Sequence, residues 1–146
     1  MNRRIAPPSP SINYSPANRA ARVLLVDRLA ISGPMLRRWL KQRGHTLDVA
    51  NDPENGFDRA VRASPDVVLI DLGRDPGSGF ALANRLSTAP ATQAVPLVAM
   101  REATMALPDR ANTVFARNVL KPIDVDELGA ILLEAAAENV KLCTRR

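Results

Sequence analysis

The chain has 146 residues, a formal net charge of +5 and a single cysteine. This length is enough for one domain with a real core, and Cys143 has no second cysteine to bridge, which favours a reducing, cytoplasmic setting. No apolar run approaches the roughly 20 residues that cross a bilayer, and prolines follow Arg3 and Arg4 where a signal peptide needs its apolar stretch. The composition therefore argues against a membrane protein and against a disulfide-stapled secreted one.

The excess of positive charge lies at the two ends of the sequence. Residues 1–22 and 140–146 hold seven of the 20 basic residues and no acid, which leaves the body between them slightly acidic. We predict a disordered, Pro-rich basic tail over 1–21, one domain over 22–139 and a basic C-terminal tail over 140–146. Solvated tails explain the charge, and docking of the tails on an anionic partner is the alternative.

Hydrophobic patterning and capping signals predict strands that alternate with helices. In chain order, the predicted elements are a strand at Val23–Val26, a helix around Met35–Leu40, a strand at His45–Val49, a helix after Asp52-Pro53, a strand at Asp66–Asp71, a helix at Phe80–Ser87, a strand at Val95–Met100, a strand within Val114–Leu120 and a helix from Asp124 to about Asn139. A further short helix could form at Ala103–Leu107 before Pro108. Strands joined by crossover helices pair in parallel, so the predicted fold class is α/β, a doubly wound five-stranded parallel sheet.

Polar residues stand where four predicted strands end. Asp27 ends the first strand, Asp71 follows the apolar run Val-Val-Leu-Ile of the third, and Arg101 and Lys121 end the fourth and fifth. In open α/β sheets the ligand site lies past the carboxyl ends of the strands, so we expect these groups to converge on one rim. A carboxylate beside a lysine that neutralises phosphoryl oxygens suits an aspartyl-phosphate intermediate. The dipeptide Lys121-Pro122 is a candidate for a cis peptide bond.

From Arg22 to Ala137 the sequence resembles the receiver domains of two-component response regulators, which have the flavodoxin-like fold of the chemotaxis regulator. The residues that carry the resemblance are Asp27, the block Val-Val-Leu-Ile-Asp71-Leu, Gly79, Pro96 and Lys121-Pro122. The resemblance implies that Asp71 is the phosphoacceptor, that Asp27 belongs to an acidic pocket and that Lys121 contacts the phosphoryl group. It also implies Mg²⁺ near Asp27, Asp71 and Gly73.

Three positions depart from the family pattern. Arg28 stands where the family usually has a second acid that binds Mg²⁺, Arg101 replaces the switch Thr or Ser, and Asn118 replaces the switch aromatic residue. A guanidinium in place of a carboxylate removes an anion and adds a fixed positive charge. Arg28 or Arg101 could pair with Asp71 or Asp27 and take the ion's place, or an arginine could partly substitute for Mg²⁺ by stabilising a phosphoryl group. We favour the first interpretation, which predicts impaired Mg²⁺-dependent phosphorylation.

The favoured function is a stand-alone, atypical receiver in phosphorelay signalling that acts by protein contact. The resemblance implies a histidine kinase, a phosphotransfer protein or an adaptor partner, and no DNA-binding domain is expected after Ala137. Basic residues cluster on the first helix as either a solvated face or a docking surface, namely Arg37, Arg38, Lys41 and Arg43. The alternative function is a module that binds a cyclic dinucleotide through Arg28, Arg74 and Arg101, although the glycine loop lacks a phosphate-cradle pattern. Beyond self-phosphorylation and self-hydrolysis, no nucleophile–base constellation points to an enzyme.

Overall fold

A single parallel sheet organises the fold in the computed structural model, which describes residues 20–28, 33–73 and 75–144. The strands are β1 (Arg22–Val26), β2 (Thr46–Ala50), β3 (Val67–Asp71), β4 (Leu97–Glu102) and β5 (Arg117–Lys121). Their order across the sheet is β2-β1-β3-β4-β5, and every neighbouring pair is parallel. The predicted doubly wound sheet with the flavodoxin-like receiver topology is therefore confirmed.

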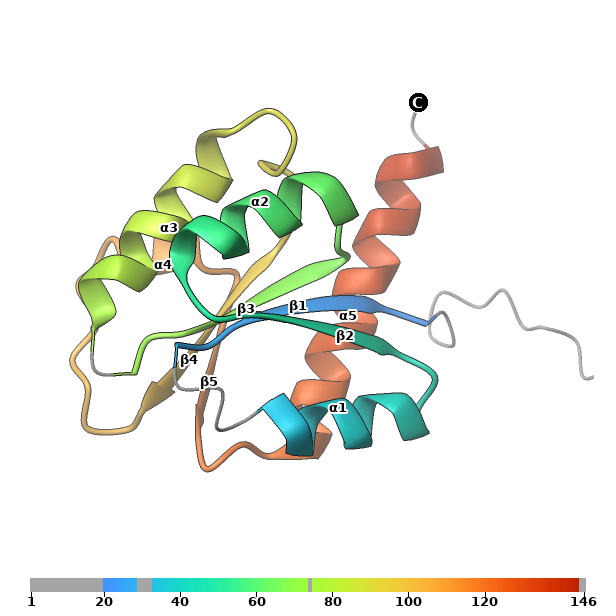
Figure 1. Ribbon diagram of the computed structural model, residues 1–146, viewed down its shortest axis with the longest axis horizontal. Coiled ribbons are helices and arrows are strands. Elements are labelled where there is room, and N and C mark those ends of the chain that lie inside the picture. Colours follow the sequence, from blue (N-terminus) through green and yellow to red (C-terminus); the bar gives the residue numbers. More distant parts are fainter. Residues whose placement is uncertain (1–19, 29–32, 74, 145–146) are drawn as a thin grey trace, which may run out of the picture.

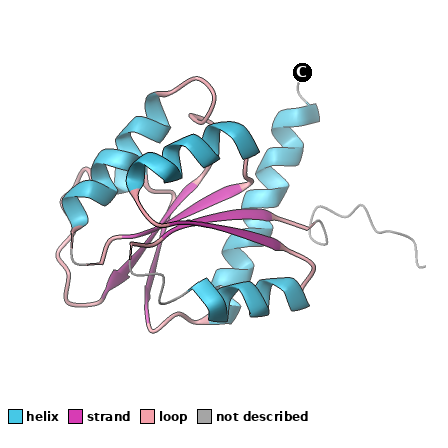
Figure 2. Ribbon diagram, in the orientation of Figure 1, coloured by secondary structure: helices cyan, strands magenta, loops and turns pink. Residues whose placement is uncertain are grey.

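Helices cover both faces of the sheet. They are α1 (Gly33–Gln42), α2 (Pro53–Ala63), α3 (Pro76–Thr88), α4 (Ala111–Val114) and α5 (Val125–Thr144). In Figure 1, α1 and α5 lie on one face, and α2, α3 and α4 lie on the other. Figure 2 shows the strands as one twisted layer between these two helical layers. No helix in the described ranges is both long and apolar enough to cross a membrane.

Each face of the sheet has its own apolar core. Successive side chains of a strand point to opposite faces, so Val23 and Leu25 join the core that includes α1 and α5. Leu24 and Val26 join the core that includes α2 and α3. The four apolar residues of β3 divide in the same way, and each is at most 1% exposed. The unbroken apolar run before Asp71 thus reflects burial on both faces.

Three predicted helix positions differ from the structure. Helix α3 begins at Pro76, because Asp75 accepts a hydrogen bond from the Ser78 N–H and caps the helix one turn before the predicted start. The possible helix at Ala103–Leu107 is wrong; the single turn of α4 lies at Ala111–Val114, beyond Pro108. Helix α5 continues to Thr144, so part of the predicted C-terminal tail is helical.

Other differences concern burial and the chain ends. The helical spacing of α1 and α2 predicts that Met35 and Val61 face the core, but they are 54% and 39% exposed. The predicted disordered tail lies largely outside the described residues, which begin at residue 20. Contacts with the domain begin at Ala21, which is fully buried and whose N–H donates to His45 Nδ1 at 2.8 Å.

Candidate functional site

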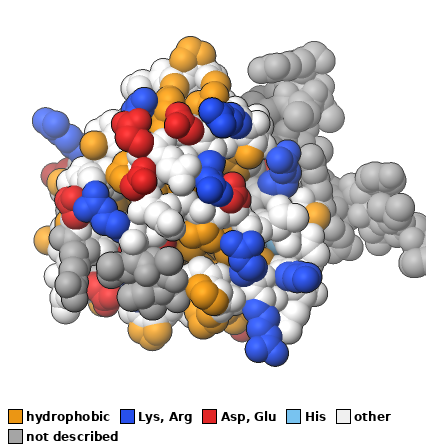
Figure 3. Space-filling view, in the orientation of Figure 1, with side chains coloured by type: hydrophobic (Ala, Val, Ile, Leu, Met, Phe, Trp, Pro, Cys, Tyr) orange, Lys and Arg blue, Asp and Glu red, His pale blue; other side chains and the backbone are white. Residues whose placement is uncertain are grey.

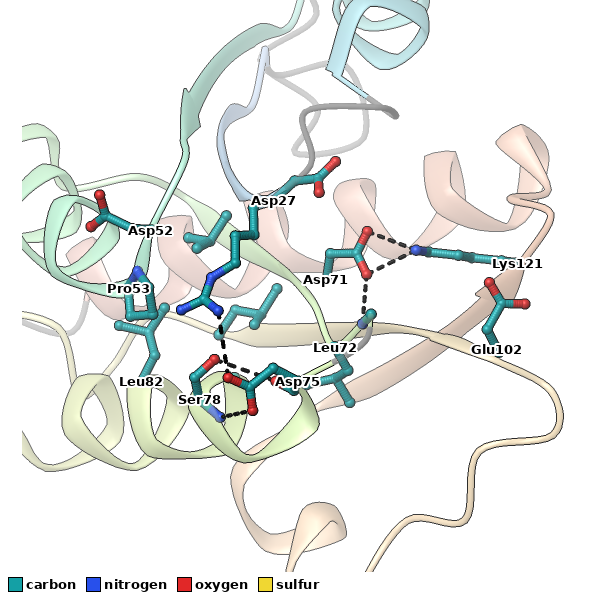
Figure 4. Close-up of a pocket in the computed structure, with 15 residues that line it drawn as sticks. Asp27, Asp52, Pro53, Asp71, Leu72, Asp75, Ser78, Leu82, Glu102 and Lys121 are labelled. Carbon is teal, nitrogen blue, oxygen red and sulfur yellow. Dashed lines mark hydrogen bonds and ion pairs between the residues drawn. The ribbon is translucent and has the colours of Figure 1, made fainter.

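A cavity of about 690 Å³ opens at the carboxyl ends of β1 and β3, the point where the strand order reverses. Its walls include the ends of β1, β3, β4 and β5 and the first turns of α2 and α3. Asp27, Asp71 and Lys121 all line it, as Figure 4 shows. The structure therefore brings the three residues of the predicted site together at one rim, whereas Arg101 is not among the lining residues.

Asp71 and Lys121 form the centre of this site. The Lys121 ammonium donates to both carboxylate oxygens of Asp71, with Nζ–Oδ1 and Nζ–Oδ2 distances of 2.8 and 2.7 Å. The Asp71 side chain is only 6% exposed, and that of Lys121 is 23% exposed. A buried carboxylate needs such a partner, because an unpaired charge in this setting is strongly destabilising. The two residues come from strands on either side of β4, and only the parallel sheet places them together.

The backbone at Gly73 contacts the Asp71 carboxylate. Its N–H donates to Asp71 Oδ1 at 2.9 Å, and its φ is +33°, a conformation that side chains with a Cβ disfavour. A Cβ at this position would lie 3.3 Å from the same Oδ1 atom. Glycine thus lets the main chain approach the carboxylate as a hydrogen-bond donor. The peptide bond between Lys121 and Pro122 is cis, as predicted.

Asp27 is the second acid of the rim. It follows β1, is 3% exposed, and its N–H donates to the Ala50 carbonyl at the end of β2. Strand β1 lies directly beside β3, in a register that places Val26 opposite Ile70. Asp27 and Asp71 are therefore corresponding residues at the ends of adjacent strands, which is the arrangement expected of an acidic pocket.

Arg28 points to a different acid from those expected. It forms an ion pair with Asp75 across the cavity rim, with an Nη1–Oδ2 distance of 3.6 Å. Both side chains of this pair are more than half exposed, so the pair adds little stability. Hydrogen bonding from Ser78 lowers the pKa of Asp75, and the Arg28 charge adds to that effect, so the carboxylate stays ionised.

Arg101 turns away from the cavity. Its Nη1 donates to the carbonyl oxygen of Met105 at 3.1 Å, within the loop that follows β4. Its Nε is buried without a hydrogen-bond partner, and so is Oδ1 of Asn118 on β5. The β4–β5 register pairs Asn118 with Ala99, two residues before Arg101, so both altered positions share one sheet face. The expectation that Arg101 reaches the acid cluster is wrong.

Glu102 is a site residue that sequence reasoning missed. Strand β4 extends two residues past its predicted end, and the register then places Glu102 opposite Lys121. The capping acids Asp52 and Asp75 also line the cavity, because the first turns of α2 and α3 form part of its wall. The repeated Asp-Pro dipeptide was the available signal for both caps. Arg74 lies outside the described residues.

The donor set for Mg²⁺ is small. In the described ranges, no three His, Cys, Asp or Glu side chains form a group that could hold a metal ion. Asp27, Asp71 and Gly73 remain as oxygen donors, and one or two carboxylates is what Mg²⁺ usually takes from a protein. Both oxygens of Asp71 also contact Lys121. The residues therefore fit the ion weakly.

Two curated proteins are similar in sequence to part of this chain. The chain is 32% identical over 96 residues, or 66% of its length, to a gliding motility regulatory protein of Myxococcus xanthus, and it covers 12% of that protein. It is 31% identical over 78 residues, or 53% of its length, to protein PilH of Pseudomonas aeruginosa, of which it covers 64%. The chain thus spans less than two thirds of either relative. No protein-family model matches it.

Solved structures share the fold. A CheY-like response regulator receiver domain from Methylobacillus flagellatus superposes with a TM-score of 0.72 at 24% identity, covering 80% of this chain and 99% of that one. The receiver domain of sensor histidine kinase PA1611 from Pseudomonas aeruginosa has a TM-score of 0.69 at 20% identity and covers 81% and 98%. That neighbour has a magnesium ion coordinated in its active-site cleft.

Proposed function

We propose that this chain is a response-regulator receiver domain that works in two-component signalling as an atypical, cytoplasmic adaptor and takes a phosphoryl group on Asp71. The observation that carries the proposal is the buried Asp71 carboxylate held by the Lys121 ammonium and the Gly73 N–H. The ion pair between Arg28 and Asp75 on the same rim is longer, at 3.6 Å, and more exposed.

The chemistry assigned to these residues is phosphoryl transfer to an oxygen nucleophile. An Asp71 carboxylate oxygen forms a bond to phosphorus while the bond from phosphorus to the donor's leaving group breaks, and the leaving group departs with the electron pair. Lys121 is placed to move from the carboxylate to the phosphoryl oxygens and to neutralise their charge. When Mg²⁺ is bound, it adds charge neutralisation at the same oxygens, and Asp27, Asp71 and Gly73 would hold it.

Mg²⁺ dependence is proposed to be weak in this chain. Arg28 replaces an anionic ligand, and its pair with Asp75 keeps a guanidinium on the cavity rim. The donor set that remains has two carboxylates, one of which is already occupied by Lys121. A hard dication gains less from such a set than from three acids.

The proposed output is contact with a partner protein through α1. This helix contains no acid. Lys41 lies four residues after Arg37 and three after Arg38, and like charges at these helical spacings repel each other. Figure 3 shows Lys and Arg side chains gathered toward this side of the molecule. Met35 adds an exposed apolar side chain to the helix. An acidic surface on a kinase or phosphotransfer protein fits this helix.

The test is to incubate the chain with a small acyl phosphate, with and without Mg²⁺, and to measure intact mass. We expect one added phosphoryl group in the wild type and none in Asp71→Asn, with little stimulation by Mg²⁺. Asp58→Asn is the matched control, because it removes one exposed carboxylate from α2 outside the cavity. An adduct that persists in Asp71→Asn would contradict the proposal.

The dinucleotide alternative loses support from the charge of the cavity. Its described lining residues include five carboxylates, those of Asp27, Asp52, Asp71, Asp75 and Glu102. Only Arg28 and Lys121 oppose them among the same residues. A ligand with two phosphates would enter against this excess of negative charge.

A further inference from the structure

We propose that Glu102 is a specificity-determining residue of the phosphoacceptor pocket: its carboxylate repels small, multiply charged phosphate donors and so reserves Asp71 for a donor carried by a partner protein. The inference rests on the proposed function for the reaction that it controls. Its physical basis, repulsion of free phosphate-like anions, can be measured without that reaction.

The sheet places Glu102 beside the reacting centre. It is the last residue of β4, and its register partner on β5 is Lys121. Both residues line the cavity that contains Asp71. Figure 4 shows the Glu102 carboxylate close to the Lys121 side chain, whose ammonium extends to Asp71. An anion that approaches Asp71 to contact Lys121 therefore also approaches Glu102.

One ammonium cannot neutralise both carboxylates. Lys121 Nζ is engaged with both oxygens of Asp71, at 2.7 and 2.8 Å, whereas Glu102 is exposed and has no ion pair among the described residues. The only other cation on the described cavity wall, Arg28, is paired with Asp75. The charge of Glu102 thus remains uncompensated at the entrance to the site.

This charge acts differently on the two kinds of donor. A free phosphate-like dianion brings two negative charges into the field of Glu102 and gains no contacts outside the cavity. Two unit charges about 4 Å apart in bulk water interact by roughly 1 kcal/mol, which corresponds to about fivefold in an equilibrium constant. A protein-borne donor can offset this repulsion through contacts elsewhere on the surface, such as those with α1.

The first test is a titration of the full chain with inorganic phosphate in the absence of Mg²⁺, followed by NMR at the Gly73 amide. We expect Glu102→Gln to bind phosphate about fivefold more tightly than the wild type, and the difference to shrink at high salt. Glu102→Asp keeps the charge and should behave as the wild type does. The control Asp58→Asn removes a distant carboxylate and should leave the affinity unchanged. Equal affinities for Glu102→Gln and the wild type would overturn the inference.

The second test separates this inference from the proposed function. With a small acyl phosphate as donor, Glu102→Gln should form the Asp71 adduct about fivefold faster than the wild type at low salt. If Glu102→Gln binds phosphate more tightly but no donor modifies Asp71, the role of Glu102 stands and the phosphoacceptor proposal fails. If the adduct forms at the same rate in both proteins across all salt concentrations, the role of Glu102 fails and the phosphoacceptor proposal stands.

Discussion

Two regions of the β3–β4–β5 half of the sheet differ in how completely their polar groups are hydrogen-bonded. We call them the acceptor end, at Asp71, and the switch end, at Arg101 and Asn118. At Asp71, every carboxylate oxygen has a donor at hydrogen-bond distance, and the side chain is nearly buried. At Arg101 and Asn118, on the neighbouring strands, a buried donor and a buried acceptor have no partner among the described residues. The first arrangement is typical of a centre maintained for chemistry. In the second, the Arg101 guanidinium donates to the Met105 carbonyl in the loop after β4.

Under the proposed function, this difference would let phosphate chemistry at Asp71 and signal output at Arg101 and Asn118 be altered separately. The proposed acceptor needs a nucleophile, a cation and a close backbone donor, which Asp71 of β3, Lys121 of β5 and Gly73 of the following loop supply. A switch would need a residue that can follow the phosphoryl group, whereas Arg101 is hydrogen-bonded to the loop after β4. Variants at each end should therefore have unlike consequences.

The largest expected effect is at the acceptor. Lys121→Met keeps the length of the side chain but removes the ammonium, so the phosphoryl oxygens lose their cation. We expect adduct formation on Asp71 to slow by about a hundredfold, measured by intact mass against time. Lys41→Met on α1 is the control, because Lys41 is exposed and remote from the cavity. An unchanged rate in Lys121→Met would remove the distinction between the two ends.

Arg28→Asp should strengthen Mg²⁺ binding at the acceptor end. The change removes a rim guanidinium and adds an oxygen ligand next to Asp27, so we expect Mg²⁺ affinity to rise by about tenfold. A metal titration followed by heat or by NMR measures it. Arg62→Asp makes the same change in net charge on an exposed part of α2, and an equal gain there would show that overall charge alone is responsible.

The switch end should tolerate the loss of its polar groups. Asn118→Val removes a buried oxygen that has no partner and places a β-branched side chain in a strand. We expect the free energy of unfolding to rise by about 1 kcal/mol, measured by urea denaturation, because no hydrogen bond to Oδ1 is lost. A decrease in the free energy of unfolding of similar size would mean that Asn118 makes a stabilising interaction. The polar groups of the switch end would then be paired, as those of the acceptor end are.

The smallest effect should come from a site remote from both ends. Burial, followed by the nearby Arg43 charge, lowers the pKa of His45 from 6.5, and its Nδ1 must be unprotonated to accept from the Ala21 N–H. A base whose folded pKa is lowered contributes its full stability above the unfolded pKa and loses it as the pH falls through 6.5 toward the folded value. Stability measured across this range should fall modestly in the wild type and stay flatter in His45→Gln.

Much of the fold was predictable because its signals are local. The apolar run of β3 and the Asp52-Pro53 cap of α2 each specify an element from neighbouring residues alone. The start of α3 was missed although Asp75-Pro76 repeats the same signal, because the glycines that follow favoured a loop. The short α4 could not be placed, since nothing in its four residues fixes a helix.

The centre of the site was predictable, and its periphery was not. Strand ends in a parallel sheet meet at one edge, which brought Asp71 and Lys121 together without any knowledge of side-chain direction. The partners of Arg28 and Arg101 depend on which way long side chains turn, and sequence spacing does not determine that. Glu102 was missed for a third reason: the length of β4 is set by its pairing with β5, at Glu102 and Lys121.

Strand β3 separates the two cores of the domain. Its alternate side chains belong to different cores, with Leu69 packed among the residues of the α1–α5 side and Ile70 among those of the α2–α3 side. A displacement that begins at Asp71 would pass into both helical layers at once, because no slack exists on either side of a strand so fully buried. Arg101 and Asn118 share the sheet face of Ala99, which belongs to the α2–α3 core, so we expect changes there to leave the packing of β3 against α1 and α5 intact.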